Sequence, residues 1–263
     1  MLINRRCLYS AMAWTLLVSA TSVWANNVDA GAIGSTVPAT APAAAPTKIN
    51  ACYATPTAVI KTLALAIKAG NSESIRQCLM VRGRAGHAAV VAFSNISAAS
   101  EKFVKTALSK LGPPPTNMAL AFGSIDASMD RLLTLLPKAV TTIHHGVAQV
   151  KFPASATGQG QTIFVRQQAD GWKVDGARLL HLNKPGLAVA AVRHRAKQLN
   201  LLAAALRETT TDIHTGKVKT WTSLEKDMEL HILESEAAME AKHQARTTPS
   251  SAAISPPPPA AAK

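Results

Sequence analysis

The chain has 263 residues, of which 48% are hydrophobic, and 28 Lys and Arg against 15 Asp and Glu give it a formal net charge of +13. The length suits one domain of ordinary size with appendages, and the apolar fraction excludes a wholly disordered chain. Three cysteines are too few for a disulfide scaffold, and beyond residue 25 no apolar run is long enough to cross a bilayer.

Residues 1–25 have the pattern of a secretory signal peptide. Arg5 and Arg6 form a positive start, an apolar stretch follows, and small residues flank Trp24 at a cleavage point after Ala25. An uncleaved membrane anchor is the alternative, but the serines and threonines in the short apolar stretch disfavour a stable span. We therefore expect a periplasmic or secreted protein, whose net charge falls from +13 to +11 when both arginines are removed.

Two further segments lack the side chains needed for a core. Residues 26–48 are rich in Ala, Pro and Thr and are predicted to form a linker. Residues 246–263 contain four consecutive prolines and are predicted to be a disordered Pro/Ala tail. The folded part is therefore predicted to comprise an α+β domain over 49–182 and a helical extension over 183–245.

Two short helices are predicted at the start of the folded part. Thr55 and Pro56 form a typical N-cap and first helical position, and Gly70 ends the first helix just before the second begins. So short a turn makes the helices antiparallel and brings Cys52 and Cys78 to the same end. In an oxidising compartment we expect a disulfide between them, worth roughly 3–4 kcal/mol. Two free buried thiols are the alternative.

The middle of the chain changes from helical to strand periodicity. A third helical region is predicted over 86–111 and a shorter helical pattern over 126–137. The segments VAQVKF, QTIFVRQ and GWKVDG then alternate apolar and polar residues between short turns. We predict an α+β fold in which three N-terminal helices pack on a curved antiparallel sheet of about four strands, followed by a C-terminal helical hairpin.

The helical extension contains two segments of opposite charge. Residues 186–212 carry an apolar seam at helical spacing together with basic side chains, and the next helix, over about 222–241, is acidic. These features predict an antiparallel hairpin that folds back on the chain. The alternative is a coiled-coil arm that pairs with a second copy, so that the C-terminal helices form a homodimer.

The stretch TPTAVIKTLALAIKAGNSESIRQCL and the later strand GWKVDG resemble the opening and the last strand of the nuclear transport factor 2-like superfamily, also called SnoaL-like or cystatin-like cones. The resemblance covers about residues 53–180. It implies a cone-shaped fold. It also implies that an enzyme of this kind would use an Asp, His or Tyr in the mouth of the cone as a general base on a small, often hydrophobic substrate.

The catalytic candidates that this resemblance implies are Asp126, Asp130, His144, His145 and His181, because a carboxylate or imidazole in a dry pocket can act as a general base. Adjacent strand residues point to opposite faces, so only one of His144 and His145 can face the cone. The sequence has no metal-ligand spacing, phosphate loop or nucleophile elbow, and we therefore predict no metal and no cofactor.

Three functions remain open. The first and preferred one is a non-enzymatic binding or interaction module for a small apolar ligand or an envelope protein, because catalytic motifs are absent. The second is a small-molecule isomerase or dehydratase that uses an Asp or His in the cone. The third is a binder of polyanions or of the envelope surface, suggested by the basic balance of the chain. Nucleic acid is not an expected partner, because aromatic residues are scarce and the protein is expected to be exported.

Overall fold

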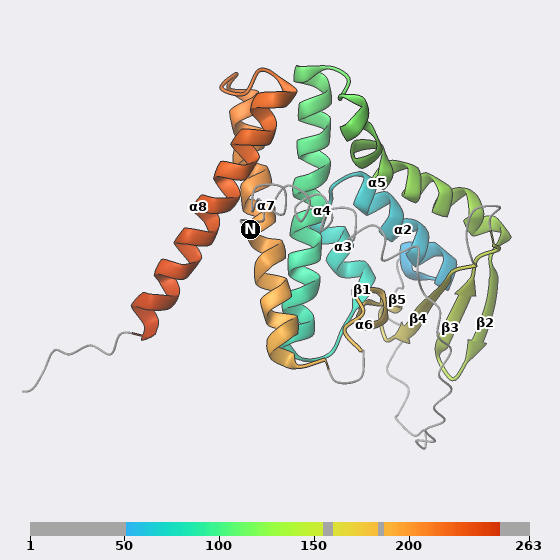
Figure 1. Cartoon of the computed structure of the whole chain (residues 1–263). Coiled ribbons are helices and arrows are strands. Elements are labelled where there is room, and N and C mark those ends of the chain that lie inside the picture. Colours follow the sequence, from blue (N-terminus) through green and yellow to red (C-terminus); the bar gives the residue numbers. More distant parts are fainter. Residues whose placement is uncertain (1–50, 155–159, 184–186, 248–263) are drawn as a thin grey trace, which may run out of the picture.

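The computed structural model describes residues 51–154, 160–183 and 187–247 (Figure 1). The predicted signal peptide, the linker and residues 248–263 of the predicted tail lie outside them. Helices come first in the described chain, and two of them begin with a side-chain cap: Thr55 Oγ1 accepts a hydrogen bond from the Ala58 amide, and the Asn71 side chain accepts one from the Ser74 amide. These helices are η1 (Ala51–Tyr53), α2 (Pro56–Lys68), α3 (Ser72–Cys78), α4 (Gly83–Leu111), α5 (Thr116–Leu135) and η2 (Leu136–Lys138).

A five-stranded sheet has the order β1-β5-β4-β3-β2. The strands are β1 (Leu79–Met80), β2 (Val140–His144), β3 (Val147–Lys151), β4 (Thr162–Gln168) and β5 (Gly171–Asp175). β2, β3, β4 and β5 form an antiparallel meander, whereas β1 pairs in parallel with β5. Because β1 connects α3 to α4, this parallel pair places the start of α4 beside the carboxyl end of β5.

The molecule is α+β, but the predicted arrangement of its elements is wrong. The described residues form seven α-helices and a mixed sheet, not three helices on four antiparallel strands. Three helices follow the strands: α6 (Gly176–Leu179), α7 (Val189–His214) and α8 (Trp221–Thr247). The additional strand β1 has only two residues, so it carries no alternating pattern. Its partner β5 is more than ninety residues away in sequence, so no local turn signals the pairing.

Two buried apolar clusters share the long helix α4. The first half of α4 contributes Val90 and Phe93 to a cluster with α2 and the sheet. Its second half contributes Phe103 and Val104 to another cluster with α7 and α8. Figure 1 shows α4 and α7 side by side along most of their lengths. The helical extension predicted from residue 183 onward therefore packs on a helix of the preceding segment.

The last two helices form an antiparallel hairpin within the chain. The chain reverses after α7 at Gly216, whose φ of +77° favours glycine. The first half of α8 packs on α7 through Leu224 and Met228, and its second half diverges from α7 (Figure 1). None of the helices in the described segments combines a bilayer-spanning length with sufficient apolar character.

Leu206 tests whether the two clusters unfold together. Leu206 lies on α7, and its side chain is fully buried in the apolar cluster that α7 forms with α4 and α8. We expect Leu206→Ala to lower the free energy of unfolding by about 2–5 kcal/mol, because apolar contact is lost and a cavity remains. Leu65→Ala, at a position 47% exposed on α2, is the matched control and should change it by about 0.5 kcal/mol or less.

Urea unfolding followed by circular dichroism measures the change, and amide hydrogen exchange locates it. If Leu206→Ala accelerated exchange in α7 and α8 but left the most protected sheet amides unchanged, the clusters would be independent.

Candidate functional site

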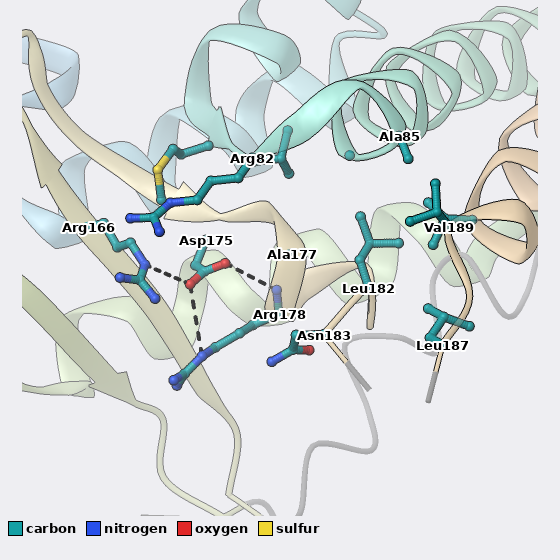
Figure 2. A pocket seen from close by; sticks show the side chains of 14 residues that line it. Arg82, Ala85, Arg166, Asp175, Ala177, Arg178, Leu182, Asn183, Leu187 and Val189 are labelled. Carbon is teal, nitrogen blue, oxygen red and sulfur yellow. Dashed lines mark hydrogen bonds and ion pairs between the residues drawn. The ribbon is translucent and has the colours of Figure 1, made fainter. Parts of the chain in front are cut away.

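A cavity of about 370 Å³ lies where the sheet meets the beginnings of α4 and α7 (Figure 2). One wall is polar and the other apolar, and Figure 2 shows the two sets of side chains on opposite sides. The polar wall carries Arg82, Arg166, Asp175 and Arg178, and the apolar wall includes Leu182, Leu187, Val189 and Val192. Such a division is typical of a site for a small molecule with one charged end and one apolar end.

Asp175 is held at the base of the polar wall by secondary structure. It is the last residue of β5 and the N-cap of α6, where its Oδ1 accepts a hydrogen bond of 3.2 Å from the Arg178 amide. Asp is a favoured N-cap because its carboxylate satisfies an amide that has no partner inside the helix. The side chain is only 5% exposed, so this buried charge requires cationic partners.

Two arginines supply these partners. Arg166, on the neighbouring strand β4, places its Nε 2.9 Å from Asp175 Oδ2, and Arg178 Nε lies 3.9 Å from the same oxygen. The Arg178 guanidinium also stacks over the Phe164 ring, 3.8 Å from its centroid. Within the described residues, no hydrogen bond uses the terminal amino groups of either arginine. Both guanidinium groups are therefore fixed in place while their outer donors stay available for a ligand.

Arg82 adds a third positive charge at the edge of the cavity. It is the N-cap residue of α4, its side chain is exposed, and it has no ion pair or hydrogen bond with the described part of the chain. Three guanidinium groups against one carboxylate give the polar wall a net charge of +2.

The beginnings of α4 and α7 add to this positive field. Neither helix has a side-chain cap or an acidic residue in its first turn. The amides of those turns therefore leave partial positive charge beside the cavity.

The side chains of the lining include features suited to binding an anion. Among the described residues that line the cavity there is no His, Cys, Ser, Thr, Tyr or Lys. Asp175 is the one carboxylate among the described lining residues, and it already accepts hydrogen bonds from Arg166 and from an amide. Paired arginine donors bind carboxylate and phosphate groups well, because the guanidinium fork matches two oxygens at once.

The predicted catalytic candidates lie elsewhere. Asp126 and Asp130 are one turn apart on α5, and Asp130 forms an ion pair with Lys68. The hydrogen bond from this pair raises the pKa of Lys68. His144 and His145 are exposed at the turn between β2 and β3.

None of these four residues lines the cavity, and neither does His181, which follows α6. The structure therefore brings Asp126 and Asp130 near each other but does not join them to the histidines.

The structure does not contain the predicted disulfide between Cys52 and Cys78. Cys52 is exposed in η1, whereas Cys78 is buried at the end of α3. Burial raises the pKa of the Cys78 thiol to about 11, so little thiolate is present at neutral pH. The alternative of two buried thiols holds for Cys78 alone.

Sequence reasoning missed the three arginines of the cavity. They are separated by more than eighty residues along the chain from Arg82 to Arg166, so no spacing links them. One local signal was present: Asp175 precedes Arg178 by three residues immediately after an alternating strand, which is typical of an N-cap.

Comparisons with known proteins do not identify a relative. No protein-family model matches the chain, and neither a curated protein nor a solved structure matches it. The resemblance to nuclear transport factor 2-like proteins therefore stays a prediction, and function has to be argued from the site itself.

Asp175 tests how the polar wall is held together. We expect Asp175→Ala to lower the free energy of unfolding by about 3 kcal/mol, because it removes a buried ion pair and a helix cap. Asp175→Asn can still accept the Arg178 amide, so it should cost about 1 kcal/mol less. Chemical unfolding measures both changes, with Asp170→Asn as an exposed control. Equal losses for the Ala and Asn variants would contradict the capping role.

Proposed function

We propose that the protein is an exported, non-enzymatic binding module for a small amphipathic anion, namely a carboxylate or phosphate monoester with a short apolar chain. The observation that carries this proposal is the cavity with guanidinium groups from Arg82, Arg166 and Arg178 on one wall and apolar side chains on the other. Export rests on the signal-peptide pattern of residues 1–25.

The polar wall is preorganised for an anion. Asp175 fixes Arg166, and Phe164 together with Asp175 restrains Arg178. Binding then costs less side-chain entropy than it would with freely rotating arginines. The net charge of +2 left on the wall favours a carboxylate or phosphate over a neutral group of the same size.

The apolar wall and the volume limit the rest of the ligand. Leu182, Leu187 and Val189 can cover a short hydrocarbon chain, which supplies favourable burial of apolar surface. A volume of about 370 Å³ is near the lower end of small-molecule sites, which range over roughly 300–1,000 Å³. A small anion therefore fits this cavity better than an extended polyanion does.

The enzymatic alternative is less well supported. General acid–base catalysis requires a proton acceptor within hydrogen-bond reach of the substrate. Asp130 is paired with Lys68 outside the cavity, and His144 and His145 are exposed at a hairpin turn. Asp175 contributes charge balance and positioning, since its oxygens already accept donors from Arg166 and Arg178.

Isothermal titration calorimetry with hexyl phosphate and hexanoate tests the binding proposal. Both probes should bind the purified chain more tightly than hexanol or inorganic phosphate, because each joins an anionic group to an apolar chain. Arg82→Gln should weaken the binding of both acids by about tenfold or more, since a hydrogen bond to a charged group is worth ~1.5–3 kcal/mol. Arg82 makes no contact that the fold requires, so this variant should remain folded.

Arg84→Gln is the matched control, because Arg84 is exposed on the same helix but does not line the cavity. Val189→Ser should weaken the binding of hexyl phosphate and leave that of inorganic phosphate unchanged. If hexanol bound as tightly as hexanoate, or if Arg84→Gln weakened binding as much as Arg82→Gln, the proposed site would be wrong.

Export has a separate test. A chain secreted by a bacterial host should begin at Asn26, because cleavage is expected after Ala25. Mass spectrometry of the periplasmic and extracellular fractions measures this terminus. Recovery of chains that start at Met1 in the cytoplasmic fraction alone would contradict export and would leave the binding proposal intact.

A further inference from the structure

A second charged cluster lies between α7 and α8, at the far end of α7 from the cavity. His231 has carboxylates beside both of its ring nitrogens. Its Nδ1 lies 3.1 Å from Glu234 Oε2 and 3.2 Å from Glu208 Oε2. Its Nε2 lies 2.9 Å from Asp212 Oδ2 and 3.5 Å from Asp227 Oδ2.

Helical spacing explains how the cluster forms. Glu208 and Asp212 are four residues apart and share one face of α7. On α8, Asp227 precedes His231 by four residues and Glu234 follows it by three, so these side chains also share a face. The apolar contacts between the two helices bring the two faces together.

Asp227 carries a buried oxygen that lacks a hydrogen bond. Its side chain is 9% exposed, and among the described residues its Oδ2 has no hydrogen-bond donor. That oxygen faces His231 Nε2 at 3.5 Å. A buried carboxylate oxygen without a donor is costly, so this atom is a candidate contact for a ligand at the cluster.

The negative charges of the cluster favour a cation as that ligand. Glu208, Asp212, Asp227 and Glu234 carry four negative charges, against which Lys217 is the cation in contact. With a neutral imidazole the cluster therefore has a net charge of −3. Lys217 touches Asp212 and lies 3.6 Å from Asp227 Oδ1, but its side chain is 58% exposed and can turn into solvent.

We propose that Asp212, Asp227 and His231 form a binding site for a divalent transition-metal ion such as Zn²⁺. Their ligand atoms lie within 4.8 Å of one another. Tetrahedral zinc, with bonds of about 2.0–2.2 Å, sets its ligand atoms roughly 3.3–3.5 Å apart. The distances of 2.9 and 3.5 Å from His231 Nε2 to the two aspartates are close to that spacing.

The other side of the imidazole supports the same assignment. A histidine that binds metal through one nitrogen usually donates its other N–H to a carboxylate, which orients the ring. Glu234 and Glu208 occupy that position at Nδ1. Their side chains are more than half exposed, whereas those of Asp212 and Asp227 are 17% and 9% exposed, so the buried ligand position is at Nε2.

An imidazole ligand selects the kind of metal. Mg²⁺ and Ca²⁺ prefer sites made of oxygen atoms, whereas Zn²⁺, Co²⁺ and Ni²⁺ accept imidazole nitrogen together with carboxylates. A metal bound here would link α7 to α8 by ligands from both helices. Metal binding should therefore stabilise the hairpin.

Titration of the tag-free, chelator-treated chain with ZnCl₂ tests the site. We expect one Zn²⁺ per chain and a rise in the thermal unfolding temperature. Bound Co²⁺ should absorb visible light, and this absorption should disappear when Zn²⁺ displaces the Co²⁺. Asp227→Asn, which keeps the shape of the side chain, and His231→Ala should each weaken Zn²⁺ binding by about tenfold or more, because each removes a ligand. His214→Ala is the matched control, since His214 is exposed in the last turn of α7 and outside the cluster.

Lys217→Gln separates a metal site from a simple ion-pair cluster. If the site binds metal, removing this competing cation should tighten Zn²⁺ binding. The proposal is overturned if neither the natural chain nor Lys217→Gln binds Zn²⁺. It is also overturned if His214→Ala weakens binding as much as His231→Ala. Circular dichroism without metal establishes that each variant is folded.

Discussion

The packing of α4 against two different partners is the constraint on which the rest of the structure depends. Its first half buries Val90 and Phe93 against the sheet side, and its second half buries Phe103 and Val104 against α7 and α8. One rigid helix of 29 residues thus sets the position of α7 relative to the sheet. The cavity exists because the beginnings of α4 and α7 both lie beside the end of β5, and the short parallel pair of β1 with β5 fixes that junction.

Asp175 makes a strongly basic wall compatible with folding. Three guanidinium groups around one small cavity would repel one another, and a buried carboxylate reduces that repulsion while it caps α6. Arg166 and Arg178 both contact Asp175 through Nε. These ion pairs therefore leave the terminal amino groups of the two arginines available as donors. The same carboxylate therefore stabilises the polar wall and preserves the ability of its arginines to bind an anion.

Local patterns predicted the individual elements better than their arrangement. The alternating segments around Val150 and Val165 are strands with one buried face, which imposes a period of two. The segment around Val174 is also a strand, but nearly all of its positions are buried. The two-residue strand β1 has no period, and its parallel partner is distant, so the sequence could not reveal it. The apolar seam of α7 was visible, but nothing in it specified α4 as the partner.

The catalytic candidates came from a resemblance rather than from contacts, and the arginines of the cavity come from segments that only the fold brings together. Within α8 the spacing of Asp227, His231 and Glu234 could have indicated half of the second cluster, but the other half lies on α7.

The two charged sites lie near opposite ends of α7, and their signs agree with the helix dipole. The amino end of α7 carries partial positive charge and lines the cavity proposed to bind an anion. Its carboxyl end carries partial negative charge, and Asp212 adds a carboxylate there in the last turn. An acidic group in the last turn of a helix is unfavourable by about 0.3–1 kcal/mol unless a cation offsets it. Lys217 offsets part of this cost from an exposed position, whereas a divalent ion held between Asp212, Asp227 and His231 would offset more of it and would satisfy the buried oxygen of Asp227. The dipole of α7 thus provides a reason, independent of ligand spacing, for a cation at this end of the hairpin.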